Sequence, residues 1–123
     1  MFVVQPNVLR DKSYDFAVHI VIFCRLLQEK REYILSKQLL RSGTSVGANI
    51  EEALQAQSKQ DFIAKLSISL KEAYESRYWI RLINDTGYAN LDDCEQLQQE
   101  LQEVIALLVS ILKKTKENLK NSQ

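Results

Sequence analysis

The sequence of 123 residues is poor in the residue types that interrupt helices, with three glycines and one proline. So few turn-forming residues predict few connections and long helices. The chain has two cysteines, Cys24 and Cys94, and their spacing is that of neither a zinc site nor a disulfide framework. We therefore interpret both cysteines as free thiols on apolar helix faces.

The chain also lacks an excess of charge and a long apolar run. Its 16 basic and 16 acidic residues cancel, whereas a dedicated nucleic-acid-binding protein usually has a basic excess. No segment approaches the roughly 20 apolar residues of a membrane span, and residues 1–6 lack the basic region of a signal peptide. We expect a cytoplasmic protein without membrane contact, in which any nucleic-acid contact depends on an uneven distribution of charge.

The remaining sequence has the apolar period of amphipathic helices. In the first of them Phe16, Ile20 and Phe23 recur at steps of three and four residues. Ser58 and Asn90 have the positions of helix N-caps, and Gly87 that of a C-terminal cap. The predicted fold is all-α, an antiparallel up-down-up-down four-helix bundle that forms a single domain over residues 1–123. Its helices are expected at about 9–29, 32–56, 59–85 and 91–119.

Two features of the first predicted helix stand out. Its end at Lys30 and Arg31 has neither glycine nor proline, so this is the weakest of the predicted boundaries. Val18, Val21 and Ile22 lie off its core-facing stripe. A helix that is apolar on more than one face usually has more than one neighbour, which indicates burial beyond the bundle.

The most distinctive segment lies in the second predicted helix, Arg41-Ser-Gly-Thr-Ser-Val-Gly-Ala-Asn-Ile-Glu-Glu-Ala53. Small side chains allow close helix packing, and we expect this segment to hold the second helix against the third. Folding the two helices back on each other places Arg41 level with Glu75. We predict an Arg41–Glu75 ion pair, with Ser45 and Asn49 hydrogen-bonded across the hairpin.

This polar cluster has two interpretations. Polar residues in a bundle seam usually specify register, which is the interpretation we favour over a binding or catalytic site. A di-metal carboxylate site needs two histidines, whereas His19 is the single histidine. Gly43 and Gly47 lie within a predicted helix, which argues against a glycine-rich phosphate-binding loop. We predict no catalytic residue, no metal and no cofactor. The candidate cluster consists of Arg41, Ser45, Asn49, Glu52, Glu72 and Glu75.

A second group of residues lies on the third predicted helix and at the C-terminus. The aromatic side chains could pack against a neighbouring helix or another subunit, or could stack on nucleic acid beside the arginines; we favour packing. The candidate oligomer interface consists of Val18, Ile22, Tyr74, Tyr78 and Trp79. The candidate nucleic-acid contacts are Arg77, Arg81, Lys113, Lys114 and Lys116, although the lysines also suit the negative end of a helix dipole.

Two segments together resemble the bacterial four helix bundle protein family, whose members were first noticed in intervening sequences of 23S ribosomal RNA genes. They are Leu39-Leu-Arg-Ser-Gly-Thr-Ser-Val-Gly-Ala-Asn-Ile-Glu-Glu-Ala53 and Asp61-Phe-Ile-Ala-Lys-Leu-Ser-Ile-Ser-Leu-Lys-Glu-Ala-Tyr-Glu-Ser-Arg-Tyr-Trp-Ile-Arg-Leu82. The likeness extends from Tyr14 to about Leu112. The hallmark positions Ser45, Asn49, Glu52, Glu72 and Glu75 are present, with Ala53 where relatives often have glycine.

The resemblance implies a cytoplasmic four-helix bundle that assembles as a homopentamer and has no established enzymatic activity. Relatives that bind nucleic acid are basic, whereas this chain is neutral. The resemblance leads us to expect a non-enzymatic homo-oligomer, with ribosomal RNA or another nucleic acid as its candidate partner. The alternatives are a scaffold that binds another protein and, with less support, an enzyme that uses the polar cluster.

Overall fold

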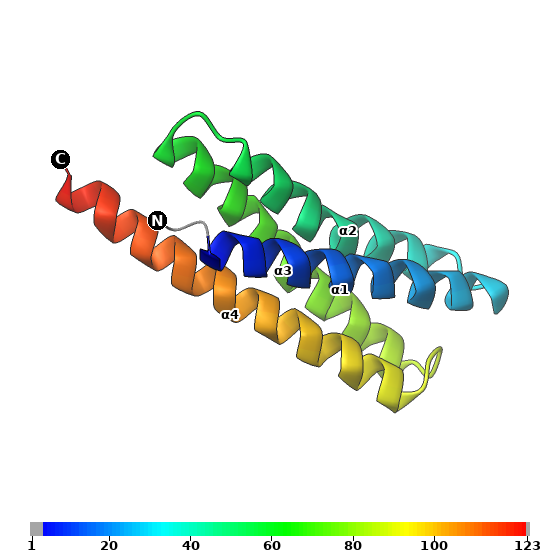
Figure 1. The fold of residues 1–123 in the computed structure, drawn as a ribbon. Helices are drawn as coiled ribbons and strands as arrows, with labels where there is room; N and C mark the ends of the chain where they lie inside the picture. Colours follow the sequence, from blue (N-terminus) through cyan, green and yellow to red (C-terminus); the bar gives the residue numbers. More distant parts are fainter. Residues whose placement is uncertain (1–3, 123) are drawn as a thin grey trace.

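The computed structural model describes the backbone of residues 4–122 and the side chains of residues 8–122. Its helices are α1 (Val4–Glu29), α2 (Ile34–Leu54), α3 (Lys59–Asp85) and α4 (Leu91–Asn121), and the described residues contain no strand. Each helix packs along its neighbours in chain order, and α4 packs back on α1 (Figure 1). α1 and α3 therefore lie across one diagonal. The predicted antiparallel four-helix bundle is confirmed.

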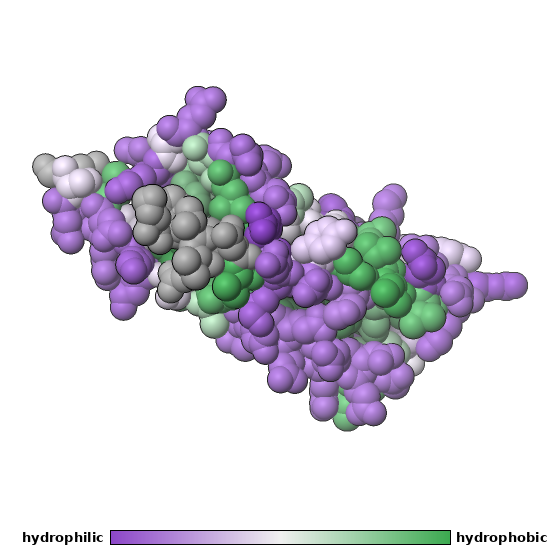
Figure 2. All heavy atoms as spheres, in the orientation of Figure 1, coloured by the Kyte–Doolittle hydropathy of each residue, from purple (hydrophilic) through white to green (hydrophobic). Residues whose placement is uncertain are grey.

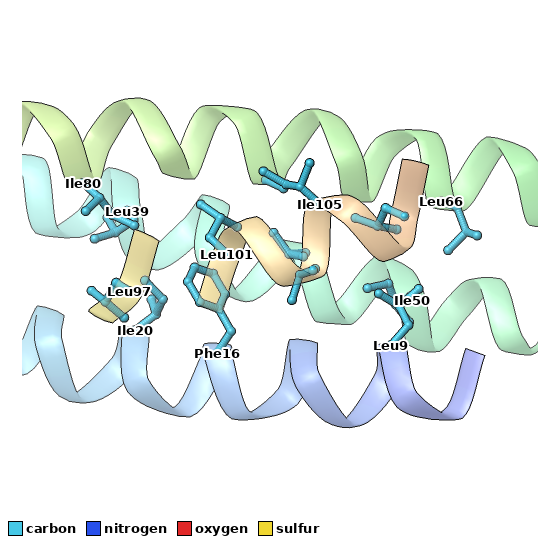
Figure 3. Close-up of a cluster of buried hydrophobic side chains, with 14 of the residues drawn as sticks. Leu9, Phe16, Ile20, Leu39, Ile50, Leu66, Ile80, Leu97, Leu101 and Ile105 are labelled. Atoms are coloured by element: carbon cyan, nitrogen blue, oxygen red, sulfur yellow. The ribbon is translucent and has the colours of Figure 1, made fainter. Parts of the chain in front are cut away.

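The core consists of apolar side chains that all four helices point inward. Phe16, Ile20, Leu39 and Ile80 are fully buried, and Leu101 joins them from α4 (Figure 3). Along each helix the buried residues recur at three- and four-residue steps, so each helix turns one continuous apolar face to the interior. The side chains on the other faces of the helices lie on the surface, where they can contact other molecules.

The ends of α3 follow from side-chain capping. Ser58 Oγ accepts a hydrogen bond from the Asp61 backbone N at 3.0 Å, as a helix N-cap does. At the other end Gly87 has φ +80°, and the Tyr88 N–H donates to the Ile83 carbonyl at 3.2 Å. This is the glycine-terminated Schellman motif. Asn90 Oδ1 caps α4 in the same way as Ser58 caps α3, by accepting from the Asp93 N at 2.8 Å.

The α1–α2 connection uses the same Schellman geometry without glycine. Arg31 has φ +65°, and the Glu32 N–H donates to the Leu27 carbonyl at 2.9 Å. The Glu32 carboxylate then accepts from the Ser36 N at 2.8 Å and satisfies a free N–H group at the start of α2. α2 therefore begins at Ile34, two residues after the predicted start at 32.

Three other bounds differ from the prediction by one or two turns of helix at most. α1 begins at Val4 rather than 9, because Pro6 falls in the first turn, where a missing N–H costs no helical bond. α2 ends at Leu54 rather than 56, and α4 extends to Asn121 rather than 119. Residues 1–3 of the segment for which we predicted no signal peptide lie outside the described residues. No described helix is both long and apolar enough to cross a membrane.

The two ends of the bundle carry different connections. The α1–α2 and α3–α4 connections lie together at one end, and the α2–α3 connection lies at the other (Figure 1). The Lys30 Nζ donates to the Tyr88 carbonyl at 3.3 Å and links the two connections. We call this the two-loop end.

Candidate functional site

The glycines of α2 face α1, not α3. A Cβ atom on Gly43 would lie 2.9 Å from Cγ2 and 3.0 Å from Cγ1 of Ile20, and one on Gly47 would lie 3.4 Å from the Ser13 carbonyl oxygen. The absence of a side chain at Gly43 is therefore what allows α1 to approach α2. The prediction that the small residues of this segment hold α2 against α3 is wrong for the glycines.

Serines hold α2 to α3. Ser76 Oγ donates to Ser42 Oγ at 2.9 Å, and Ser69 Oγ donates to the Val46 carbonyl at 2.7 Å. All three serines are fully buried. Among the described residues, every buried polar side-chain atom has a hydrogen-bond partner, so this seam needs no ligand to satisfy it.

Ser45 and Asn49 do not bond across the hairpin, which corrects the prediction. Ser45 Oγ donates to the Arg41 carbonyl at 2.7 Å, and Asn49 Nδ2 donates to the Ser45 carbonyl at 2.8 Å, both within α2. Both residues are half-buried. They lie beside the α2–α3 seam, where a carbonyl four residues earlier on the same helix is the nearest partner.

The predicted Arg41–Glu75 ion pair is present, and Glu72 and Trp79 also take part in it. The Arg41 guanidinium bonds to Glu75 and also to Glu72 Oε1 at 3.1 Å. Trp79 Nε1 donates to Glu75 Oε2 at 3.0 Å. The Trp79 hydrogen bond first, and then Arg41, lower the pKa of Glu75, while the Glu75 hydrogen bond raises the pKa of Arg41. The cluster is partly exposed, and each of its charged groups has an oppositely charged partner. It therefore holds α2 to α3 rather than presenting a free acid or base.

Glu52 lies outside that cluster. It accepts from the Lys65 Nζ at 2.9 Å near the α2–α3 connection, and this hydrogen bond raises the pKa of Lys65. The six predicted cluster residues therefore do not form one site. Arg41, Glu72 and Glu75 form an ion-pair cluster, Glu52 pairs separately with Lys65, and Ser45 and Asn49 bond within α2.

The cysteines are poorly suited to nucleophilic chemistry. Both are buried and unpaired. Burial, with a smaller contribution from Glu32, raises the pKa of Cys24 to about 12, and burial with Asp93 nearby raises the pKa of Cys94. Because the thiolate is the reactive form, both thiols stay protonated near neutral pH. No group of three His, Cys, Asp or Glu side chains within the described part of the chain could hold a metal ion.

The outer face of α3 alternates tyrosine and arginine. The Arg77 guanidinium carbon lies 5.2 Å from the Tyr74 ring centroid, and that of Arg81 lies 6.0 Å from the Tyr78 ring centroid. Tyr74 and Tyr78 are 46% and 49% exposed. Trp79 instead packs partly against the core, with its ring 5.0 Å from that of Tyr78. We call Tyr74, Tyr78 and their two arginines the α3 face.

The outer face of α1 is apolar. Tyr14 is 64% exposed and Ile22 is 48% exposed, and Val18 and Val21 lie between them with more than a third of their surface exposed. We call these four residues the α1 face. Because α1 and α3 lie across a diagonal, the α1 face and the α3 face point to opposite sides of the bundle.

Charge is segregated along α4. Residues 91–112 contain five acids and neither lysine nor arginine, whereas residues 113–121 contain four lysines and one glutamate. Lys113, Lys114 and Lys116 are all exposed. The predicted uneven charge therefore exists, with the basic segment at the end of the bundle opposite the two-loop end (Figure 1).

A groove of about 320 Å³ lies between α1 and α4 towards the two-loop end. α1 contributes His19, Ile22, Phe23 and Leu26 to its lining. α4 contributes Asp93, Gln96, Leu97 and Glu100. His19 Nδ1 donates to Glu100 Oε1 at 2.7 Å, and Gln96 Nε2 donates to Glu100 Oε2 at 2.9 Å.

Sequence reasoning missed this groove as a site. The available signal was the apolar surplus of α1, which includes Leu26 in addition to the α1 face. Recognising the groove also required knowing that the first turns of α4 lie beside the last turns of α1. His19, the single histidine, is half exposed and has Glu100 as its partner.

Comparison with known proteins now adds to this geometry. The model of the 23S rRNA-intervening sequence protein family matches residues 7–110. A crystal structure of a protein of unknown function from the S23 ribosomal protein family of Bacteroides thetaiotaomicron VPI-5482 is 50% identical in sequence, with a TM-score of 0.86. The match covers 89% of this chain and 98% of that protein. A search of curated proteins finds no match. From its helices, its motif segment and this match, the chain belongs to the 23S rRNA-intervening sequence protein family.

Proposed function

We propose that this chain works without catalysing a reaction, as a self-associating bundle whose assembly presents basic side chains to ribosomal RNA. The observation that carries the proposal is the pair of apolar and aromatic faces on α1 and α3. The two buried, unpaired thiols fit the reducing environment of the cytoplasm.

Self-association follows from the cost of leaving these faces in water. Burying apolar surface stabilises a complex by about 25 cal/mol per Å², and contiguous exposed apolar patches commonly mark interfaces. The α1 face is aliphatic with one tyrosine, and the α3 face has two tyrosines backed by Trp79. Aromatic side chains with arginine are typical of interface centres.

The opposite orientation of the two faces favours a ring. If the α1 face of one copy packs on the α3 face of the next, the contact is heterologous, and such contacts close into rings when the rotation is right. Five copies is the number that the family resemblance implies. In this arrangement Arg77 and Arg81 lie within the interface, so we assign nucleic-acid contact to the lysines of α4.

Nucleic-acid contact follows from the charge of α4. Cyclic symmetry places Lys113, Lys114 and Lys116 of every copy at the same end of the ring. Several weak phosphate contacts then act together, and the neutral net charge of one chain no longer limits binding. The acidic part of α4 stays at the other end, so the phosphate contacts made by α4 all lie at one end of the ring.

The ring is tested by sedimentation of three full-length variants. Val18→Glu on the α1 face and Tyr78→Glu on the α3 face should each give monomers with unchanged helical circular dichroism. Val109→Glu is the matched control, because Val109 is equally exposed on α4 outside both faces. An equimolar mixture of Val18→Glu and Tyr78→Glu should form a one-to-one dimer, because each variant keeps one intact face. A monomeric wild type, or dissociation by Val109→Glu, contradicts the ring.

RNA contact is tested by filter binding of a labelled structured fragment of 23S ribosomal RNA across a salt series. Replacing Lys113, Lys114 and Lys116 by alanine should weaken binding and reduce the salt slope by about one for each phosphate that the lysines no longer neutralise. Lys37→Ala, at an exposed site on α2, serves as the control. If the wild type retains no RNA at low salt while it still sediments as an oligomer, RNA binding is refuted and self-association stands.

A further inference from the structure

We propose that the groove between α1 and α4 docks a helix of a partner protein that carries a large apolar side chain with an arginine or lysine one turn away. The proposal goes beyond the function proposed above, because it concerns a surface that shares only Ile22 with the α1 face and has no part in the RNA contact. It rests on the composition of the groove, its charge and the surface beside it.

The floor of the groove is apolar and already shaped. Leu26 is 46% exposed, and Phe23 and Leu97, which also line the groove, belong to the buried core. A volume of about 320 Å³ is at the small end of ligand sites. An open groove of this size between two helices suits the anchor side chains of a third helix, which enter such grooves at three- and four-residue spacing.

The charge of the groove determines which partner fits. Asp93 and Glu100 line it, and no lysine or arginine does. His19 and Gln96 hold the two oxygens of Glu100 in place, so the carboxylate is positioned before a partner arrives. A basic side chain would be attracted, whereas the phosphates of RNA or of an anionic membrane would be repelled. The geometry therefore favours a basic, apolar protein segment.

The surface beside the groove extends this site over the two-loop end. Ile34 is 76% exposed and Leu91 is 56% exposed, and Tyr33 and Tyr88 are also exposed there. Figure 2 shows an apolar area over the later half of α1, with mainly hydrophilic surface below it and at the tip beyond it. The opposite end has a polar connection, Gln55-Ala-Gln-Ser58. A partner helix that leaves the groove at the two-loop end would meet further apolar surface.

The proposal is tested by selection of a displayed library of random peptides against the full-length protein, with counter-selection on the Leu26→Ser/Glu100→Lys double variant. Leu26 and Glu100 are not core residues, and circular dichroism checks that the double variant is folded. We expect enriched peptides with an arginine or lysine within one helical turn of a large apolar residue. Enrichment without such basic residues, or equal enrichment on the double variant, overturns the proposal.

The enriched peptide is then measured by fluorescence anisotropy on single variants. Leu26→Ser should weaken binding at least tenfold, and Glu100→Gln at least threefold with a smaller salt dependence. Val109→Ser and Glu95→Gln are the matched controls, since both residues are exposed on α4 and neither lines the groove. An equal weakening in the controls would contradict the assignment.

A second copy of this chain is the occupant that this experiment must exclude. Sedimentation of Leu26→Ser should leave the self-association of the wild type unchanged. If Leu26→Ser converts an oligomer to monomers, the groove is a self-interface and the partner proposal is overturned. If instead Val18→Glu leaves the wild-type state unchanged while peptide binding depends on Leu26, the ring fails and the docking site stands.

Discussion

The two inner faces of α2 are both built from small residues, yet they hold their neighbours by different means. Towards α1, Gly43 makes room for Ile20, with no polar contact between the two residues. Towards α3, Ser42 and Ser76 share a buried hydrogen bond, and Ser69 bonds to the α2 backbone. The α1–α2 contact depends on the missing side chain of Gly43, whereas the α2–α3 contact depends on the serine hydroxyl groups.

A run of small residues therefore has no single structural role. Gly43 matters because of its small volume, so a larger side chain there lowers stability by overlapping with the branched side chain of Ile20. Ser76 matters because of its hydrogen bond, so its replacement lowers stability by leaving Ser42 without that partner. The two faces should therefore respond differently to substitution, and four experiments test this.

The largest effect is expected for Gly43→Val. The Cβ position lies within 3.0 Å of two Ile20 side-chain atoms, and overpacking a closed core costs about 3 kcal/mol at the upper end of the usual range. Urea unfolding should show that loss. Ile20→Ala should cost less in the Gly43→Val background than in the wild type, because the valine fills the cavity. Simple additivity would show that Ile20 is not the clashing partner.

Ser76→Ala is expected to cost about 1–2 kcal/mol, because it leaves the Ser42 hydroxyl with one weak bond to the Leu39 carbonyl at 3.4 Å. Ser45→Ala is the control, since Ser45 bonds within its own helix and alanine favours helix. The free energy of unfolding of Ser45→Ala should change by less than about 0.5 kcal/mol. An equal loss of unfolding free energy in both variants would show that the hydrogen bond across the hairpin contributes no more to stability than one within a helix.

Gly47→Ala should stabilise the protein by about 0.5–1 kcal/mol, opposite in sign to Gly43→Val, because alanine gains about 1 kcal/mol of helix propensity over glycine. Its new Cβ would meet the Ser13 carbonyl oxygen at 3.4 Å, at the edge of ordinary contact. The thermal midpoint measures this change. A fall in the midpoint would mean that α1 tolerates no added atom at either glycine.

The smallest effect concerns pH. The pKa of Glu75 is lowered by Trp79 and then Arg41, so the unfolded state binds more protons than the folded state in acid. The contribution of this carboxylate to stability is present above its unfolded pKa of about 4.3 and is lost as the pH falls through the lower folded pKa. In Glu75→Gln, the free energy of unfolding measured below about pH 4.5 should fall less steeply. Identical slopes would show that Glu75 is not protonated on unfolding.

The fold was predictable because the local signals agree with one another. The apolar period, the Ser58 and Asn90 caps and Gly87 together mark α3 and the start of α4 at the residues where the structure has them. The α1–α2 connection lacked such a signal, because Arg31 takes a left-handed conformation that no local residue type announces. The surrounding bundle imposes that conformation.

For the candidate site, the sequence predicted which residues of α2 and α3 lie at the same height along the bundle, but not which way their side chains point. Counting from the α2–α3 turn placed Arg41 beside Glu75 correctly. It did not show that Ser45 and Asn49 point beside the seam, because one residue along a helix rotates a side chain by about 100°. The choice between a carbonyl of the same helix and a partner on α3 depends on that rotation. The groove escaped sequence reasoning for a similar reason, since the predicted bundle placed α1 beside α4 but did not give the rotation that turns their side chains towards each other.

The separation of charge along α4 has a practical consequence. A chain with equal numbers of acidic and basic residues should bind only weakly to ion-exchange resins near neutral pH if its charges are evenly mixed over the surface. Here the lysine-rich end of α4 concentrates positive charge in one segment of the surface. We expect a cation exchanger at low ionic strength to retain the protein through these lysines.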